Sequence, residues 1–372
     1  MESDDSKDAE AGKMEPTETL PHIKRVSRIK HAILQRYLPV WAQILGASNQ
    51  RLCYFDCYAG RGEYEFQGER VEGSAPIAVR AGKDYVSAKS GRLMTVILIE
   101  RDEIEAKALE NCLQQFQPYS GGLQVQVLRG DSQALIEEIL AQVNSLAPSF
   151  FMIDPYGHPL SIPLINQILE RQKTEALINL MWYQINRDLA NPAVYHRLDK
   201  LFGDGSWRTQ PFMNERGRVR ERHFLDFFCS RLRGEFVFPF KICFGPEDKI
   251  PGNRTKYYLL HVSNHPKAVL MMKEVMWRLG DEDGTFDFSG ESQEPLISET
   301  PRLEELETAL SKEFGGQEVA FQHILEKTWR LPFLEKHYRQ VIQGLRSREI
   351  VKVRPVTSKK TGLKGQDIVK FP

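Results

Sequence analysis

Hydrophobic residues along the chain follow two alternating patterns, short apolar runs and longer amphipathic stretches. The runs are typical of buried strands, and they cover residues 51–56, 93–99, 123–128, 150–153, 176–182, 236–244 and 256–262. The stretches repeat apolar residues at helical spacing, at 22–45, 102–117, 132–144 and 266–279, with a further helix start at 73 and Ser74 as its expected cap. Strands that alternate with helices predict an α/β fold with a doubly wound, mostly parallel sheet of seven strands.

The remaining segments divide the chain around this sheet. Residues 1–19 are acidic, polar and poor in apolar groups, which predicts a disordered tail. The sheet domain spans 20–280, and its helix at 22–45 is expected to bend or break at Pro39. An insertion at 183–235 is long enough to carry extra helices and to shape a substrate face. Residues 281–300 are acidic and contain Gly, Ser and Pro, which indicates a linker.

Residues 301–372 predict a second, smaller domain. Helical patterns precede strand patterns there, the helices at 302–314, 319–328 and 333–346 and the strands at 350–356 and 367–371 around a basic loop at 358–365. Three helices followed by a β-hairpin form a winged-helix-like arrangement. Residues 327–370 contain twelve Lys and Arg but three Asp and Glu, so the chain's net charge of zero conceals a basic C-terminus.

The first strand ends on Asp56 and breaks into a turn that contains Tyr58, Ala59, Gly60 and Gly62. Glycines let a backbone turn sharply and approach a ligand without a Cβ in the way. The turn lacks the Gly-x-Gly-x-x-Gly of dinucleotide sites and the Gly-Lys-Ser/Thr of phosphate loops. It resembles instead the first motif of S-adenosylmethionine (SAM) methyltransferases, in which an acid and a glycine turn hold the methionine part of the cofactor.

Four acidic residues stand at or just past the ends of predicted strands, namely Asp56, Glu100, Asp131 and Asp154. These strand ends share one edge of a doubly wound sheet, so the acids are expected to converge on one crevice. Asp56 would face the methionine ammonium of SAM, Glu100 the ribose hydroxyls, and Asp131 the adenine amino group. The alternative for any one of them is a helix cap.

The fourth acid opens the motif Asp154-Pro155-Tyr156-Gly157. An exocyclic amine can donate hydrogen bonds to a carboxylate and to a backbone carbonyl. These acceptors would raise the electron density on its nitrogen and aim the nitrogen at a methyl donor. Pro155 stiffens the turn, and Tyr156 offers a face to a base taken out of its stack. The alternative is an Asp-Pro-x-Gly turn without chemistry.

Two family resemblances agree with this interpretation. Lys30-His31 on a helix, followed by Asp56-Cys-Tyr-Ala-Gly-Arg-Gly-Glu-Tyr, is similar to the opening of the large-subunit ribosomal RNA adenine-N6 methyltransferases. That resemblance implies that Lys30 reaches the SAM site or the catalytic loop, and that Asp154 is the catalytic aspartate. The motif order Asp-Pro-Tyr-Gly is closer to the Asp-Pro-Phe-Gly of tRNA guanine dimethyltransferases, so adenine and guanine both stay open as targets.

Over residues 28–278 the chain also resembles the three-Cys-motif partner (TcmP) family, whose members are methyltransferase-like. The matching stretches include KHAILQRYLPVWAQIL, FDCYAGRGEYE, FFMIDPYG and RTKYYLLHVSNHPKA. This resemblance implies a class I methyltransferase fold, with a winged-helix-like tail in keeping, and a protein partner with a Cys-rich motif. It implies no substrate.

Composition adds few constraints. Hydrophobic content of 41% and charged content of 27% are typical of a globular protein. The five cysteines show no paired spacing, which favours reduced thiols in a cytoplasmic protein. No apolar run is long enough to span a membrane, and the N-terminus lacks the regions of a signal peptide.

Three functions compete on this sequence. The first is a SAM-dependent methyltransferase acting on a base amine of RNA or DNA, with the basic C-terminus contacting phosphates. The second is a SAM-fold scaffold subunit that acts with a protein partner and lacks turnover. The third is a nuclease whose four acids hold Mg²⁺, although their spacing suits an extended nucleoside ligand better.

Several other residues have both a functional and a structural interpretation. Residues 253–256 could contact phosphate or form a solvated loop. Four arginines of the insertion could face a nucleic acid or lie on an exposed helix face, namely Arg216, Arg218, Arg220 and Arg222. Trp182 and Tyr183 could line a pocket for the base, and the alternative is that they pack in the core. Cys53 and Cys57 are favoured as core thiols over metal ligands because no second pair or histidine lies nearby in the sequence.

Overall fold

The computed structural model describes residues 20–119, 121–143, 145–248, 250, 254–280, 287–288, 303–356 and 362–372. The expected tail at 1–19, most of the linker at 281–300, Asn253 and residues 358–361 of the basic loop lie outside the described residues. Within the described part, every helix is too short or too polar to cross a membrane.

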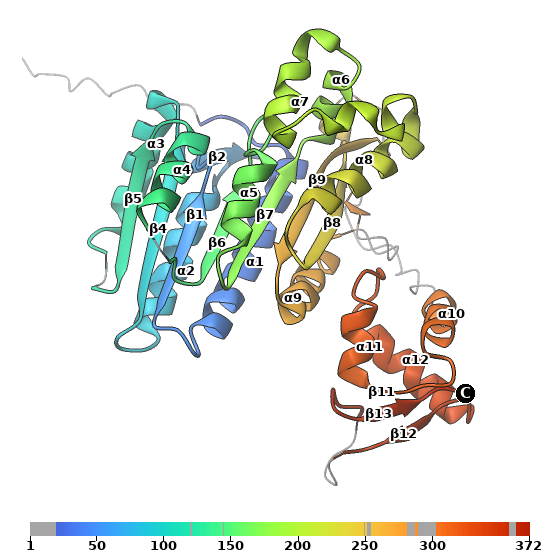
Figure 1. Cartoon of the computed structure of the whole chain (residues 1–372). Helices are drawn as coiled ribbons and strands as arrows, with labels where there is room; N and C mark the ends of the chain where they lie inside the picture. The colour runs from blue at the N-terminus through green and yellow to red at the C-terminus, as the bar shows by residue number, and fades with distance from the viewer. Residues whose placement is uncertain are drawn as a thin grey trace, which may run out of the picture.

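One large sheet forms the centre of the molecule (Figure 1). Its strands are β1 (Arg51–Asp56), β4 (Leu93–Glu100), β5 (Leu123–Arg129), β6 (Ser149–Ile153), β7 (Thr174–Leu180), β8 (Phe236–Cys243), β9 (Thr255–Ser263) and β10 (Asp287–Phe288). They lie in the order β10-β8-β9-β7-β6-β1-β4-β5. The first five of these strands in the chain pair in parallel, and β9 runs antiparallel to both β7 and β8.

This topology is that of a class I methyltransferase fold. The seven predicted strands, numbered along the chain, follow one another across the sheet as 3-2-1-4-5-7-6, and the seventh is reversed. The prediction of a mostly parallel α/β sheet is therefore confirmed. The two-residue strand β10 adds an eighth strand from within the segment expected to be a linker.

Helices cover both faces of the sheet and define two apolar cores. One core joins α1 (Arg25–Leu45), α2 (Ser74–Ser87), α3 (Glu103–Leu113) and α9 (Pro266–Trp277) to one face. The other face packs against α4 (Ser132–Gln142), α5 (Ile162–Leu169), α6 (Trp182–Asp188), α7 (Tyr195–Phe202) and α8 (Gly217–Arg231). The last three helices lie in the segment expected to be an insertion, 183–235. The expected break at Pro39 is absent, because α1 continues through this residue as one helix.

A hairpin that the sequence did not predict follows the glycine turn. It consists of β2 (Glu63–Phe66) and β3 (Glu69–Glu72), joined by Gln67 and Gly68. Both linking residues have positive φ, 54° and 84°, as a tight type I′ turn requires. The amide of Ile23 donates to the Glu65 carbonyl at 2.9 Å, so the segment before α1 anchors this hairpin.

The C-terminal module has its own core. It contains α10 (Leu303–Phe314), β11 (Glu318–Ala320), α11 (Phe321–Lys327), α12 (Glu335–Ser347), β12 (Lys352–Arg354) and β13 (Ile368–Lys370). The expected helices and hairpin are present, and β11 adds a third strand to give an antiparallel sheet in the order β11-β13-β12. Its designation as a winged helix stays a prediction.

This module docks beside α9 (Figure 1). The Trp329 ring lies edge-on to Phe236 at 5.1 Å between centroids. The Lys273 ammonium, on α9, donates to the carbonyls of Trp329 at 3.1 Å and Leu331 at 2.7 Å. Phe236 is the first residue of β8, so the module attaches at the amino end of that strand and away from the carboxyl edge of the parallel sheet.

We expect Trp329→Ala to undock the C-terminal module while both parts stay folded. Trp329 is only 8% exposed, and removing a buried Trp side chain typically costs about 3–5 kcal/mol. Small-angle scattering should show a larger radius of gyration with unchanged circular dichroism. His323→Ala, at an exposed position of α11, is the matched control. An unchanged radius in Trp329→Ala would contradict this account of the interface.

Candidate functional site

Asp154 lies just after β6 and is held by side chains from two other elements. The Lys30 ammonium, from α1, donates to Oδ1 at 2.7 Å and lies 2.5 Å from Oδ2. The Asn179 amide, near the end of β7, donates to the same Oδ1 at 2.6 Å. The side chains of Asp154 and Lys30 are 15% and 14% exposed. A carboxylate can be sheltered to this degree only if hydrogen bonds replace its lost hydration.

Asn179 is a site residue that sequence reasoning missed. Its side chain is buried, and its Oδ1 has no hydrogen-bond partner among the described residues. Buried polar atoms are nearly always paired. The signal was available, because Asn179 is the only polar residue in the otherwise apolar run 176–182.

Asp56 is fully buried at the end of β1. Its carboxylate accepts hydrogen bonds from the Tyr58 amide at 3.3 Å and the Tyr54 hydroxyl at 3.3 Å, and also from the Ser74 hydroxyl. Burial raises the pKa of Asp56 from 3.8 to about 6, an effect that these donors oppose and the charge of Asp154 reinforces. Ser74 was expected to cap α2, but Gly73 occupies the cap position and Ser74 bonds Asp56 instead.

The glycine turn needs its two glycines. Gly60 and Gly62 have φ of +61° and +87°, in the left-handed region that side chains disfavour. A Cβ at Gly60 would lie 2.6 Å from the Tyr64 hydroxyl, and one at Gly62 would lie 2.9 Å from Cys112 Sγ. Ala59 is buried, and its amide donates to the Ile99 carbonyl at 2.9 Å. The turn is thus a tight backbone cradle, which is the feature a bound nucleoside cofactor requires.

Glu100 lies directly beside this cradle. Its Oε2 accepts the Gly60 amide at 2.9 Å, and its Oε1 accepts the Asp102 amide at 2.8 Å. Asp131 is exposed and caps α4 by accepting the Ala134 amide at 3.2 Å, as the helix-cap alternative anticipated. Each carboxylate oxygen has two lone pairs, so both acids keep capacity for a further donor.

The four acids therefore line one edge but do not form a compact cluster. Among the described residues, no group of three or more His, Cys, Asp or Glu side chains could hold a metal ion. The nuclease interpretation requires several acids around one Mg²⁺ ion, and the described residues contain no such group.

The loop after Asp154 combines a fixed part with a free one. Pro155 is buried, whereas Tyr156 is fully exposed and Gly157 has no neighbour within 4 Å of a would-be Cβ. His158 Nε2 lies 3.2 Å from Asp188 Oδ2, which ties the loop to α6. Burial lowers the pKa of His158. The Tyr156 ring has room to move, while the loop that carries it is anchored at both ends.

The remaining candidates are mainly structural. Cys57 is buried and Cys53 half-buried, and burial raises the pKa of both free thiols. Trp182 packs against Phe224 in the core. Tyr183 is half-buried and meets Phe244 edge-on at 4.9 Å.

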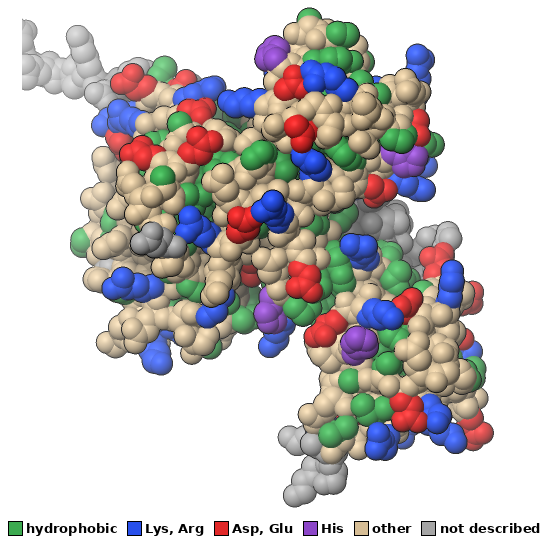
Figure 2. Space-filling view, viewed as in Figure 1, with side chains coloured by type: hydrophobic (Ala, Val, Ile, Leu, Met, Phe, Trp, Pro, Cys, Tyr) green, Lys and Arg blue, Asp and Glu red, His purple; other side chains and the backbone are tan. Residues whose placement is uncertain are grey.

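The arginines of the insertion divide into two groups. Arg220 is half-buried and donates to the Phe212 carbonyl at 2.9 Å, a structural role. Arg216, Arg218 and Arg222 are exposed. Figure 2 shows Lys and Arg interspersed with Asp and Glu over the face that it draws. No large patch of Lys and Arg alone stands out on that face.

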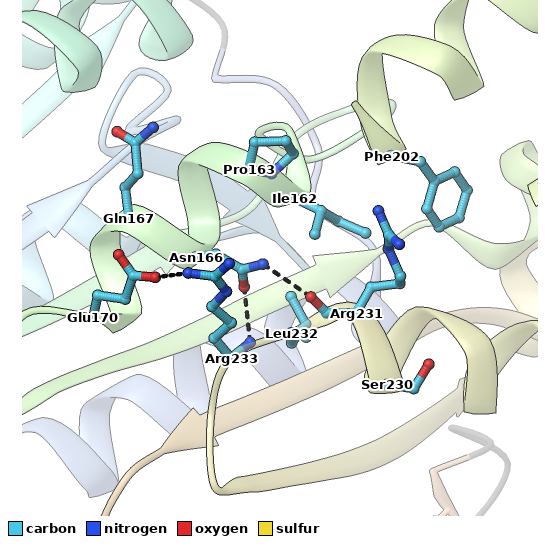
Figure 3. Close-up of a pocket in the computed structure, with 10 residues that line it drawn as sticks. All are labelled: Ile162, Pro163, Asn166, Gln167, Glu170, Phe202, Ser230, Arg231, Leu232 and Arg233. Carbon is cyan, nitrogen blue, oxygen red and sulfur yellow. Dashed lines mark hydrogen bonds and ion pairs between the residues drawn. The ribbon is translucent and has the colours of Figure 1, made fainter. Parts of the chain in front are cut away.

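A groove of about 510 Å³ lies away from this edge, between α5 and the end of α8 (Figure 3). Its polar groups are already engaged. Arg233 pairs with Glu170, and the Asn166 amide donates to the Arg231 carbonyl at 2.9 Å. The groove shares no lining residue with the site around Asp154, and its hydrogen bonds join α5 to the chain that leaves α8.

Comparison of the sequence with known proteins gives no family assignment. No family model matches the chain, and no curated protein matches its sequence, so neither resemblance drawn from the sequence is supported by a family match.

Solved structures show only distant likenesses. Protein LPL1258 from Legionella pneumophila is 12% identical with a TM-score of 0.40 over 68% of this chain and 91% of its own. A dimethyladenosine transferase from Plasmodium falciparum is 12% identical with a TM-score of 0.28 over 89% and 90% of the two chains. MNMC2 from Aquifex aeolicus is 13% identical with a TM-score of 0.33 over 65% and 63%.

We predict that Asp56→Asn changes how stability depends on pH. With a pKa of about 6 in the folded state against 3.8 in the unfolded state, Asp56 binds more protons when folded between these values. Its contribution is therefore complete below pH 4 and is lost as pH rises through 6. The difference in unfolding free energy should shift in favour of the Asn variant by roughly 3 kcal/mol from pH 4 to 7.

Denaturant titrations across this range measure that difference. Asp84→Asn, which alters an exposed carboxylate of α2, is the control. A difference between native protein and Asp56→Asn that stays constant with pH would refute the raised pKa.

Proposed function

We propose that the protein is a SAM-dependent methyltransferase that methylates an exocyclic amine of a nucleic-acid base. The observation that carries this proposal is the Lys30–Asp154–Asn179 cluster beside the glycine turn. Asp154 and Asp56 follow adjacent strands of the sheet, β6 and β1. An acceptor for an amine therefore lies next to a cradle suited to a nucleoside cofactor.

The residues of the cradle fit SAM in this proposal. Tyr58, Ala59, Gly60 and Gly62 form its backbone wall, and Glu100 keeps acceptor capacity for ribose hydroxyls. Asp131 keeps one carboxylate oxygen for the adenine amino group. Asp56 is buried behind the turn, so it supports the backbone that meets the methionine part. When bound, SAM supplies the electrophilic methyl group.

In this proposal, Asp154 accepts a hydrogen bond from an N–H group of the target amine and so aims the nitrogen lone pair at the methyl group of SAM. Such positioning lowers barriers by roughly 7–11 kcal/mol in favourable cases. Lys30 and Asn179 fix the carboxylate from the side of the protein, so its free lone pairs face the substrate. Pro155 stiffens the turn, and the exposed Tyr156 covers a base taken out of its stack. Adenine and guanine both fit this description, and the Cys-rich protein partner stays a prediction.

Asp154→Ala should reduce methyl transfer by about a hundred- to ten-thousandfold and leave SAM affinity within about tenfold, or 1.4 kcal/mol. Methyl transfer and SAM affinity should respond differently because, in this proposal, Asp154 acts on the amine whereas the glycine turn holds the cofactor. Tritiated-methyl transfer to pooled RNA and DNA, with calorimetric titration of SAM, measures both quantities. Asp84→Ala, on the exposed face of α2, is the control. Full activity in Asp154→Ala would remove this residue from the mechanism.

Gly60→Val should weaken SAM binding by at least about tenfold. A branched side chain is strained at φ +61°, and its Cβ would displace the Tyr64 hydroxyl 2.6 Å away. Gly121→Val is the control, because a Cβ there meets nothing within 4 Å. Equal SAM affinity in the two variants, by calorimetry, would show that the turn is not the cofactor site.

A further inference from the structure

A cavity of about 330 Å³ lies beside α1, between this helix, strand β3 and the start of α2. It is lined by Arg25, Arg28, Ile29, His31, Ala32, Gln35, Val71, Glu72 and Ile77. Ligand pockets in proteins span about 300–1,000 Å³. A single nucleotide therefore matches its size.

The cavity and the proposed active site share a wall. Lys30 and His31 are neighbours on α1, but Lys30 bonds Asp154 whereas His31 stacks on Tyr64 at 6.0 Å between centroids. The Tyr64 hydroxyl is also the nearest atom to a would-be Cβ at Gly60. An extended ligand could thus occupy the site at Asp154 and continue into the cavity past His31.

The lining combines an apolar floor with a cationic rim. Ile29 and Ile77 are buried, while Ala32 and Val71 are half-buried. The Arg28 guanidinium lies over the Phe66 ring at 4.2 Å, which orients it. Arg25 and Arg28 occupy the first turns of α1, where the helix dipole also favours an anion. The acid in the lining, Glu72, pairs with Arg80.

Acidic residues also approach this helix end. The Arg25 amide donates to Glu247 at 3.3 Å, and Lys24 pairs with Asp248 at 2.7 Å. Neither acid lines the cavity. We therefore assign the attraction of an anion to Arg28 rather than to Arg25, because the Phe66 ring orients the Arg28 guanidinium at the rim of the cavity.

His31 adds an unmet hydrogen-bonding group to the lining. Its Nδ1 is shielded from solvent and has no partner among the described residues. Burial, with the charges of Lys30 and Arg28, lowers the pKa of His31 to about 4 despite the opposing charge of Asp154. The ring is neutral at pH 7, so it offers one donor and one acceptor, which suits a base edge or a sugar hydroxyl.

We propose that this cavity is a subsite for the nucleotide that flanks the target base in a single strand. The apolar floor takes the face of the flanking base, and Arg28 with Arg25 takes its phosphate. This inference rests on the proposed function, because it assumes that the substrate at Asp154 belongs to a nucleic acid. It assigns the phosphate contacts near the site to α1 rather than to the C-terminal module, which docks at the other edge of the sheet.

Binding of a fluorescent single strand about ten nucleotides long tests the subsite, with saturating S-adenosylhomocysteine present and RNA and DNA as separate arms. Arg28→Ala should weaken binding about tenfold and reduce the slope of log affinity against log salt by about 0.7, the value for one phosphate on a single strand. Arg36→Ala removes an exposed charge from the same helix outside the cavity and should change neither. Equal effects of these two variants would overturn the proposal in favour of diffuse attraction.

Ala32→Phe separates a filled cavity from surface charge. It narrows the cavity and changes no charge, so it should weaken strand binding with the salt slope unchanged. Native affinity in this variant would also overturn the subsite. Strand binding without methyl transfer by the native protein would refute the proposed function while leaving the subsite intact.

Discussion

The site depends on how two carboxylates are accommodated at neighbouring strand ends. Asp56 and Asp154 follow β1 and β6, which pair directly, and the charge of Asp154 helps to raise the pKa of Asp56. Lys30 offsets this repulsion from α1, and Asn179 adds a neutral donor from β7. One acid is held by local hydroxyls and amides in the interior, whereas the other is ion-paired at the edge of the crevice. This division leaves only Asp154 accessible to a substrate.

The strand order then separates two sides of the crevice. From β1 outward through β4 and β5, the strand ends carry the backbone of the glycine turn and the carboxylates of Glu100 and Asp131. From β6 outward through β7, they carry Asp154 and Asn179. Lys30 reaches the second side because α1 packs against β6, where Tyr37 and Trp41 meet the Phe150 ring. In the proposed function, the first of these is the cofactor side and the second is the substrate side.

Much of the fold could be predicted because buried parallel strands are continuous apolar runs. The hairpin β2–β3 escaped prediction because its strands, Glu-Tyr-Glu-Phe and Glu-Arg-Val-Glu, have only four residues each, and the second contains a single apolar residue. The reversed direction of β9 has no local signal, since antiparallel pairing is decided by contacts with β7 and β8. At the site, Asp154 was predicted from its place after a strand and Lys30 from a family resemblance, but pairing with Asn179 depends on which strands are neighbours. Ser74 bonds Asp56 rather than capping its helix, and this contact has no local signal either.

The C-terminal module shows why a count of charges along the chain misleads. The basic excess of 327–370 suggested phosphate contacts, yet the module supplies acids from outside that window. Lys327 pairs with Glu313, Arg348 with Glu307 and Lys370 with Glu318. These pairs lie at the surface, where each contributes little stability, but they reduce the field that a distant phosphate would experience. These acids offset part of the basic excess counted in 327–370, and the module itself docks at the amino end of β8.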